Sequence, residues 1–169
     1  MPSCAEGNIR LRGKRNNLIR FLAHELVSVI HPEEGTYAER PIKIEENQGG
    51  WSLILKRGED TDALLCFHGS NRYFIHMEDD ELEIDTSDGK RQNEDQVLFL
   101  DQYECPWEID YEFFRQKAIA YRIDIRTFIW ETGMKCSSVT TWYRNGSIDE
   151  EKKSYADWLW DSSMPYWDY

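Results

Sequence analysis

Four histidines are the first residues in this chain that could do chemistry. His24 and His31 lie seven residues apart, close to one face if a single helix carries both, and His68 and His76 could approach Cys66 across neighbouring strands. A zinc site needs three or four convergent ligands of these types, and the spacing fixes no such set. We therefore assign no catalytic residue, no metal ligand and no cofactor, and keep a metal-dependent enzyme as an alternative.

A second candidate for metal chemistry is the acidic run MEDDELEID at residues 77–85. Paired carboxylates can bind Mg²⁺ or Ca²⁺, but the glycine and terminal glutamate of the EF-hand pattern are missing. The chain also lacks a glycine-rich phosphate loop, the GxSxG motif of serine hydrolases and the HExxH zinc motif. Solvated acids are the simpler interpretation, while a site assembled by the fold from distant residues stays open.

Negative charge is concentrated in the middle of the chain. The formal net charge is -12 over 169 residues, and residues 78–112 hold fourteen Asp and Glu against two Lys and Arg, whereas acids and bases balance on either side. Such a field repels nucleic-acid phosphates and speeds association with a basic protein surface. The alternative is a solvated face that only aids solubility.

The last fifteen residues, YADWLWDSSMPYWDY, contain six aromatic residues, three Asp and no Lys or Arg. Tyr and Trp are enriched in binding hot spots, so we predict that the end of this tail and the acidic region bind a partner. The predicted partner-binding residues are Glu78, Asp79, Asp80, Glu81, Glu83, Asp85, Asp88, Glu94, Asp95, Tyr166, Trp167 and Tyr169.

Trp158 and Trp160, in the first half of the tail, have a different interpretation. Large exposed apolar patches are uncommon on monomers, so this acidic aromatic stretch could fold back over Arg10, Arg12 and Arg126 and complete the core. We favour this structural interpretation for the two tryptophans.

The apolar pattern predicts strands and two helices. Alternation predicts a strand over residues 7–13, and apolar residues three and four apart predict a helix from Asn16 or Asn17 to Ile30. Asp110 is the expected cap of the second helix. Further expected elements are strands at 51–56, 63–68, 72–77 and 81–85, a strand or a segment packed along the sheet edge at 96–101, a helix at 109–122, a hairpin over 123–130 and 135–144 that ends at a turn at Asn145 and Gly146, and a short edge strand or helical turn at 148–155.

This order of elements favours an α+β sandwich, a mostly antiparallel sheet with both helices on one face. The other face would present Arg10, Arg12, Arg126, Phe128, Trp130 and either Trp142 or Tyr143. Cations and rings on an open sheet are what a platform for single-stranded nucleic acid needs. The overall charge opposes phosphate and the RNA-recognition consensus is missing, so direct nucleic-acid binding is the weaker expectation.

The opening NIRLRGKRNNLIRFL and the stretch AYRIDIRTFIWETGMKCSSVTTWYRNGS resemble the YubB-like group of ferredoxin-like proteins of phages and plasmids. The two segments cover about a quarter of the chain. The resemblance implies a ferredoxin-like fold over residues 1–154, with insertions carrying hairpins at 32–50 and 77–96, and sets residues 155–169 apart as an acidic aromatic tail. It implies an origin on a mobile genetic element, and no catalytic residue.

Together these observations predict a non-catalytic protein-binding module. In its sharpest form the hypothesis is an inhibitor of a host nucleic-acid-binding defence complex, such as a CRISPR effector, that presents carboxylates in place of phosphates. Scattered cysteines, no apolar membrane span and no secretory signal lead us to expect a cytoplasmic protein with reduced thiols. The alternatives are a single-stranded nucleic-acid binder and the metal-dependent enzyme.

Overall fold

The computed structural model describes residues 4–30, 38–70, 72–86, 94–131 and 136–154. In these ranges the chain forms two helices and twelve strands. The helices are α1 (Arg15–Glu25) and α2 (Tyr111–Tyr121). The strands are β1 (Cys4–Lys14), β2 (Leu26–Ile30), β3 (Ala38–Pro41), β4 (Lys43–Glu46), β5 (Ser52–Lys56), β6 (Leu64–Phe67), β7 (Phe74–His76), β8 (Glu81–Asp85), β9 (Asp95–Pro106), β10 (Asp124–Glu131), β11 (Cys136–Trp142) and β12 (Ile148–Lys153).

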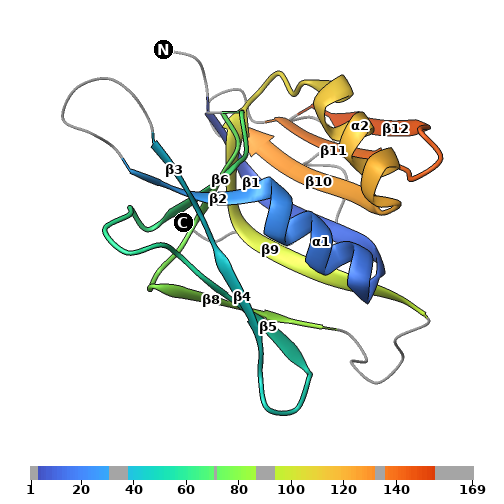
Figure 1. Ribbon diagram of the computed structural model, residues 1–169. Coiled ribbons are helices and arrows are strands. Elements are labelled where there is room, and N and C mark those ends of the chain that lie inside the picture. Colours follow the sequence, from blue (N-terminus) through green and yellow to red (C-terminus); the bar gives the residue numbers. More distant parts are fainter. Residues whose placement is uncertain (1–3, 31–37, 71, 87–93, 132–135, 155–169) are drawn as a thin grey trace, which may run out of the picture.

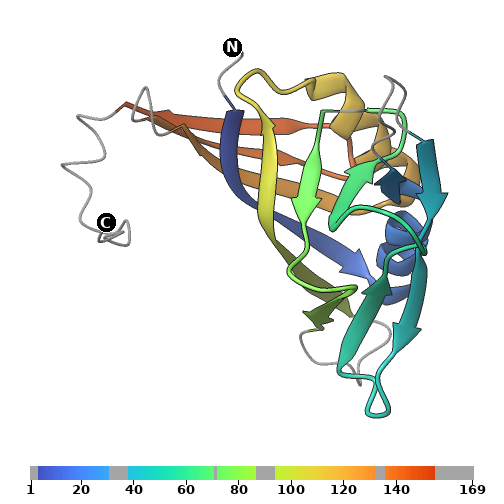
Figure 2. The ribbon, with the colours of Figure 1, turned by 90° about the vertical axis from the view of Figure 1, so that its left-hand side faces the viewer.

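The strands form two antiparallel sheets. Nine of them make a long sheet in the order β12-β11-β10-β1-β9-β7-β6-β2-β3, and three make a small sheet in the order β4-β5-β8. Figure 1 shows the small sheet below the helices, and Figure 2 shows both helices on the same side of the long sheet. The ferredoxin-like α+β sandwich that we expected is therefore wrong, because the described residues build a mostly β architecture around two short helices.

One hydrophobic core joins the two sheets and the helices. Phe114 of α2 lies at its centre, with its ring centroid 4.9 Å from that of Trp142 on β11 and 5.6 Å from that of Phe67 on β6. Leu55 of the small sheet belongs to the same cluster and is fully buried. Trp142 is also fully buried, which excludes it from the open face of the long sheet.

The second helix begins as the sequence predicts. Asp110 accepts hydrogen bonds from the backbone N–H groups of Glu112 and Phe113, which caps the first turn of α2. The predicted turn at Asn145 and Gly146 is also confirmed, because the N–H of Gly146 donates to the carbonyl of Tyr143.

The first helix is shorter than predicted. It begins at Arg15 after Lys14, whose side chain makes no cap, so the expected Asn caps are wrong. Its last predicted turn is instead strand β2, which pairs with β3 and β6. The predicted insertion at 32–50 likewise contains strands β3 and β4, and the insertion at 77–96 contains β8.

Candidate binding surfaces

The long sheet has a face that the helices do not cover. Along β10, Ile125, Thr127 and Ile129 are buried, whereas Arg126 is exposed and Phe128 and Trp130 are half-buried. Side chains alternate between the two faces of a strand, so these last three share the open face. Neighbouring strands add Asn8, Arg10 and Phe99. We call the six residues Asn8, Arg10, Phe99, Arg126, Phe128 and Trp130 the arginine–aromatic face.

Two arginines lie directly opposite each other at the centre of this face. Arg10 on β1 is the cross-strand partner of Arg126 on β10, and the Arg10 guanidinium lies 4.4 Å from the centroid of the Phe99 ring. Like charges directly opposite each other destabilise a sheet. Neither arginine forms an ion pair with a carboxylate anywhere in the described ranges. The fold therefore keeps two uncompensated cations side by side.

A bulge in β9 shapes the depression beside these arginines. Gly7 pairs with Tyr103 but Ile9 pairs with Leu100, so Asn8 faces two residues, one of which is Gln102 with a φ of 56°. Bulges bend a strand and increase its twist. The depression has a volume of about 720 Å³.

Polar groups lie inside and around this depression. The side-chain oxygen of Asn8 is buried there without a hydrogen-bond partner among the described atoms. Carboxylates of Glu6, Asp101 and Glu104 line one end, where Glu104 lies 2.7 Å from Nε2 of His76. The surface thus offers cations and an unused acceptor, with acids at one rim.

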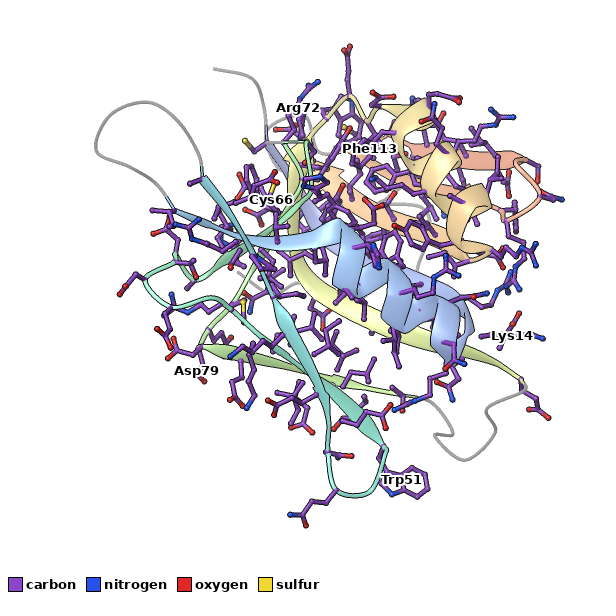
Figure 3. All side chains as sticks on the ribbon, in the orientation of Figure 1. Lys14, Trp51, Cys66, Arg72, Asp79 and Phe113 are labelled. Carbon is purple, nitrogen blue, oxygen red and sulfur yellow. The ribbon has the colours of Figure 1, made fainter. Side chains whose placement is uncertain are left out.

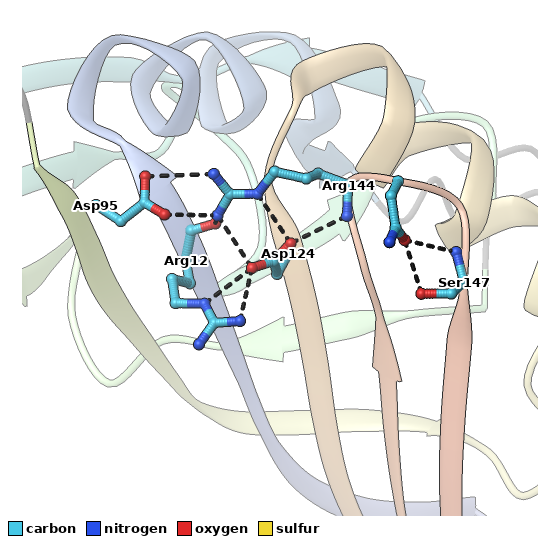
Figure 4. Close-up of polar contacts among 6 residues, drawn as sticks. Arg12, Asp95, Asp124, Arg144 and Ser147 are labelled. Atoms are coloured by element: carbon cyan, nitrogen blue, oxygen red, sulfur yellow. Dashed lines mark hydrogen bonds and ion pairs between the residues drawn. The ribbon is translucent and has the colours of Figure 1, made fainter.

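An ion-pair network holds the far end of β1 and β10 together (Figure 4). Asp124 accepts from Nε of Arg12 at 2.8 Å and from Nε and the backbone N–H of Arg144 at 3.0 Å. Arg144 also donates to Asp95 at 2.8 Å. Burial raises the pKa of Asp124, but the hydrogen bonds from Arg144 and Arg12 outweigh burial and lower this pKa from 3.8 to about 2. Arg12 is therefore paired with a carboxylate, whereas Arg10 and Arg126 have no such partner in the described ranges.

Five of the predicted partner-binding carboxylates line a second depression, of about 710 Å³, at the start of β8. Among the described residues that line it, Arg57 is the one basic residue, and it donates to Asp80 at 2.8 Å. Lys56 bridges Glu45 and Glu81 on the outer face of the small sheet at 2.9 and 3.0 Å. We call this surface the acidic depression, and its carboxylates are Glu78, Asp79, Asp80, Glu81 and Glu83.

The remaining predicted partner-binding residues lie elsewhere. Asp85 is at the other end of β8, and Asp95 begins β9 opposite Lys14. Figure 3 shows Asp79 and Lys14 on opposite sides of the molecule, so Glu94 and Asp95 are remote from the acidic depression. The structure thus divides the predicted anionic region. Asp88, Tyr166, Trp167 and Tyr169 lie outside the described residues.

The three histidines within the described ranges do not converge. His68 contacts Glu39, and His76 contacts Glu104 on another strand. In the ranges that the structure describes, which omit His31, no group of three or more His, Cys, Asp and Glu is placed to hold a metal ion. All four cysteines have free thiols, and burial raises the pKa of Cys105 to about 12.

Sequence reasoning missed part of the arginine–aromatic face. It found Arg10, Arg126, Phe128 and Trp130 because they alternate with apolar residues. Phe99 alternates in the same way within 96–101 and is 41% exposed, so that pattern could have found it. The alternation along residues 7–13 places Asn8 on the same side as Arg10, but no signal in the sequence shows that its side-chain oxygen is buried beside the bulge of β9.

Among the described residues, no helix is both long and apolar enough to cross a membrane. The comparisons with known proteins add no relative. No protein-family model matches the chain, and neither the curated proteins nor the solved structures include a match.

Proposed function

We propose that this protein is a non-catalytic protein-binding module whose acidic depression docks on a basic surface of another protein. The observation that carries the proposal is the lining of the depression, in which the described residues place five carboxylates around one arginine. Opposite charges on two surfaces steer their encounter and increase the association rate. Origin on a mobile genetic element, suggested by the sequence resemblance, would fit an inhibitor of host defence.

The most specific form of this proposal is nucleic-acid mimicry. In that form the partner is a host defence complex that binds nucleic acid, such as a CRISPR effector, and the carboxylates occupy the groove that normally holds phosphates. DNA or RNA would then compete with this protein for the partner. A partner that binds both together would contradict mimicry while leaving protein binding intact.

Neutralising the acidic depression should weaken capture of the partner. We expect the triple variant Glu78→Gln, Asp79→Asn and Glu83→Gln to lose about tenfold in affinity, because exposed charges act mainly on the association rate. Asp80 and Glu81 are left unchanged because they pair with Arg57 and Lys56. The measurement is quantitative pull-down from a lysate of the source organism, followed by titration of the captured protein.

The matched control removes three exposed carboxylates elsewhere, with Glu59→Gln, Glu108→Gln and Asp149→Asn. It should bind as the wild type does. Raising the ionic strength should weaken wild-type binding, since salt screens exposed charges. Capture that survives both the triple variant and high salt would refute the electrostatic mechanism.

A second candidate function is binding of single-stranded nucleic acid, favoured by the alternation of Arg126, Phe128 and Trp130 beside Arg10. Bases stack on rings while arginines contact phosphates. We expect Arg10→Ala with Arg126→Ala to abolish any shift of a labelled oligonucleotide in a gel. If the wild type shifts neither DNA nor RNA at low salt, this candidate fails.

A further inference from the structure

The arginine–aromatic face has three kinds of group that an additional ligand could contact. Arg10 and Arg126 have no carboxylate partner within the described chain, and the buried oxygen of Asn8 has no donor. Phe99 is 41% exposed beside them. A ligand that contacts all three would need carboxylates for the arginines, N–H donors for the Asn8 oxygen and apolar rings for Phe99. An acidic aromatic peptide has all of these groups.

The chain carries such a peptide at its own C-terminal end. Residues 155–169 contain three Asp, six aromatic residues and no Lys or Arg. Three of the aromatic residues are tryptophans, whose indole N–H groups are hydrogen-bond donors. The charge of this segment is therefore complementary to the two arginines, and its rings can pack on the exposed ones.

The described chain ends next to this face. Lys153 on β12 pairs with Ser137, and Ser137 pairs with Trp130 on β10. Two strand spacings separate Lys153 from Trp130, about 10 Å, and Arg126 lies four residues farther along β10, about 13 Å. The direct path from Lys153 to Arg126 is thus about 16 Å, whereas the eight residues from Lys153 to Asp161 can span about 26 Å. The segment has ample length to reach both arginines.

We propose that residues 155–169 dock on the arginine–aromatic face of their own chain and cover it. A covalently attached segment acts at roughly millimolar effective concentration, so contacts that are individually weak suffice. Nucleic acid is the less favoured occupant, because it brings one charged phosphate per nucleotide past the rim acids Glu6, Asp101 and Glu104, whereas the segment brings three carboxylates in fifteen residues. The docked segment would regulate the face by excluding other ligands until it is displaced. This inference does not depend on the acidic depression.

Amide hydrogen exchange of the full chain, followed by mass spectrometry at low salt, tests the proposal. In the wild type, amides in 155–169 should exchange more slowly than in a free peptide of the same sequence. In the variant Arg10→Glu with Arg126→Glu they should exchange about tenfold faster, because the charge complementarity is reversed. Adding Asp157→Lys and Asp161→Lys to that variant should restore slow exchange.

Two matched variants separate docking from misfolding. Arg40→Glu with Arg72→Glu makes the same charge change at exposed positions off the face, and the segment should stay protected. Asp157→Asn with Asp161→Asn leaves the sheet untouched, yet it should accelerate exchange in the segment. Circular dichroism and thermal unfolding check that every variant folds.

Three results would overturn the proposal. The first is exchange in 155–169 as fast as in the free peptide for every variant. The second is protection that rises with protein concentration, because the occupant is then the segment of a second copy. The third is an unprotected segment in a wild type whose open face binds an oligonucleotide. All three results are measured on the isolated protein, without capturing a partner. A negative result for docking of the segment is therefore distinct from a negative result for the proposed function.

Discussion

Gly7→Ala should destabilise the protein by more than about 3 kcal/mol, or prevent folding, although it adds a single methyl group. A β-carbon at Gly7 would lie 1.8 Å from the backbone carbonyl oxygen of Phe128 and 2.9 Å from the α-carbon of Ile129. Both atoms belong to the backbone of β10, so no side-chain rotation relieves the clash. The methyl group fits only if β1 and β10 separate, which breaks their pairing in the middle of the long sheet.

The matched control is Gly69→Ala. Gly69 has a φ of 72° and nothing within 4 Å of the position of an added β-carbon, so the cost is the left-handed backbone alone, about 1 kcal/mol. Urea unfolding followed by circular dichroism measures both variants. Equal, small losses of stability for the two would show that β1 and β10 are not packed at this position as the structure has them.

The close approach at Gly7 lies beside the candidate surface. The next residue along β1, Asn8, is the cross-strand partner of Phe128, and both line the depression. If Gly7→Ala folds at all, it should therefore also lose protection of residues 155–169. That joint loss would connect the geometry of the sheet to the docking that we propose.

Local signals in the sequence predicted local structure well. Asp110 lies where a cap is needed, and the alternation along β1 and β10 places arginines and rings on one face. These features depend on residues a few positions apart. The predicted end of the first helix was wrong because it depends on distant residues. Leu26 and Val29 fit the apolar stripe of a helix as well as they fit a strand. Their segment forms strand β2 because it pairs with β3 and β6.

Long-range pairing is also what made the predicted fold wrong. The expected sandwich treats residues 32–50 and 77–96 as insertions into a small sheet. In the structure β7 pairs with β9 and β2 pairs with β6, which extends one sheet to nine strands. Strand β8 is not part of that sheet and pairs with β5 in the small one. Which distant strands pair, and in which register, cannot be predicted from patterns among neighbouring residues.

The candidate surfaces divide in the same way. The sequence identified the acidic run, and the structure brings five of its members together at one depression while placing Asp95 far away. It identified Arg10 and Arg126 as outward residues. That they lie directly opposite each other follows from the strand register, which the sequence does not show.

Asp124→Asn should lower the free energy of unfolding at pH 7 by about 2 kcal/mol. The carboxylate is nearly buried, with 9% of its side chain exposed, and it accepts from Arg12 and Arg144. The amide keeps the shape but loses the charge, so the two guanidinium groups lose their shared counterion. Asp149→Asn, at an exposed position on β12, is the control and should change stability by less than about 0.5 kcal/mol.

The effect of Asp124→Asn should depend on pH in a defined direction. The pKa of Asp124 is lowered in the folded protein, from 3.8 to about 2. Its contribution is therefore fully present above the pKa of the unfolded chain and is lost as the pH falls through the folded value. Urea unfolding at pH 7, 5, 3 and 2 should show the full difference between wild type and variant at pH 7 and 5, a smaller one at pH 3 and the smallest at pH 2. A difference that is constant over this range would mean that the carboxylate charge does not bind Arg12 and Arg144, and that the network in Figure 4 is not what holds β1 to β10 at this end.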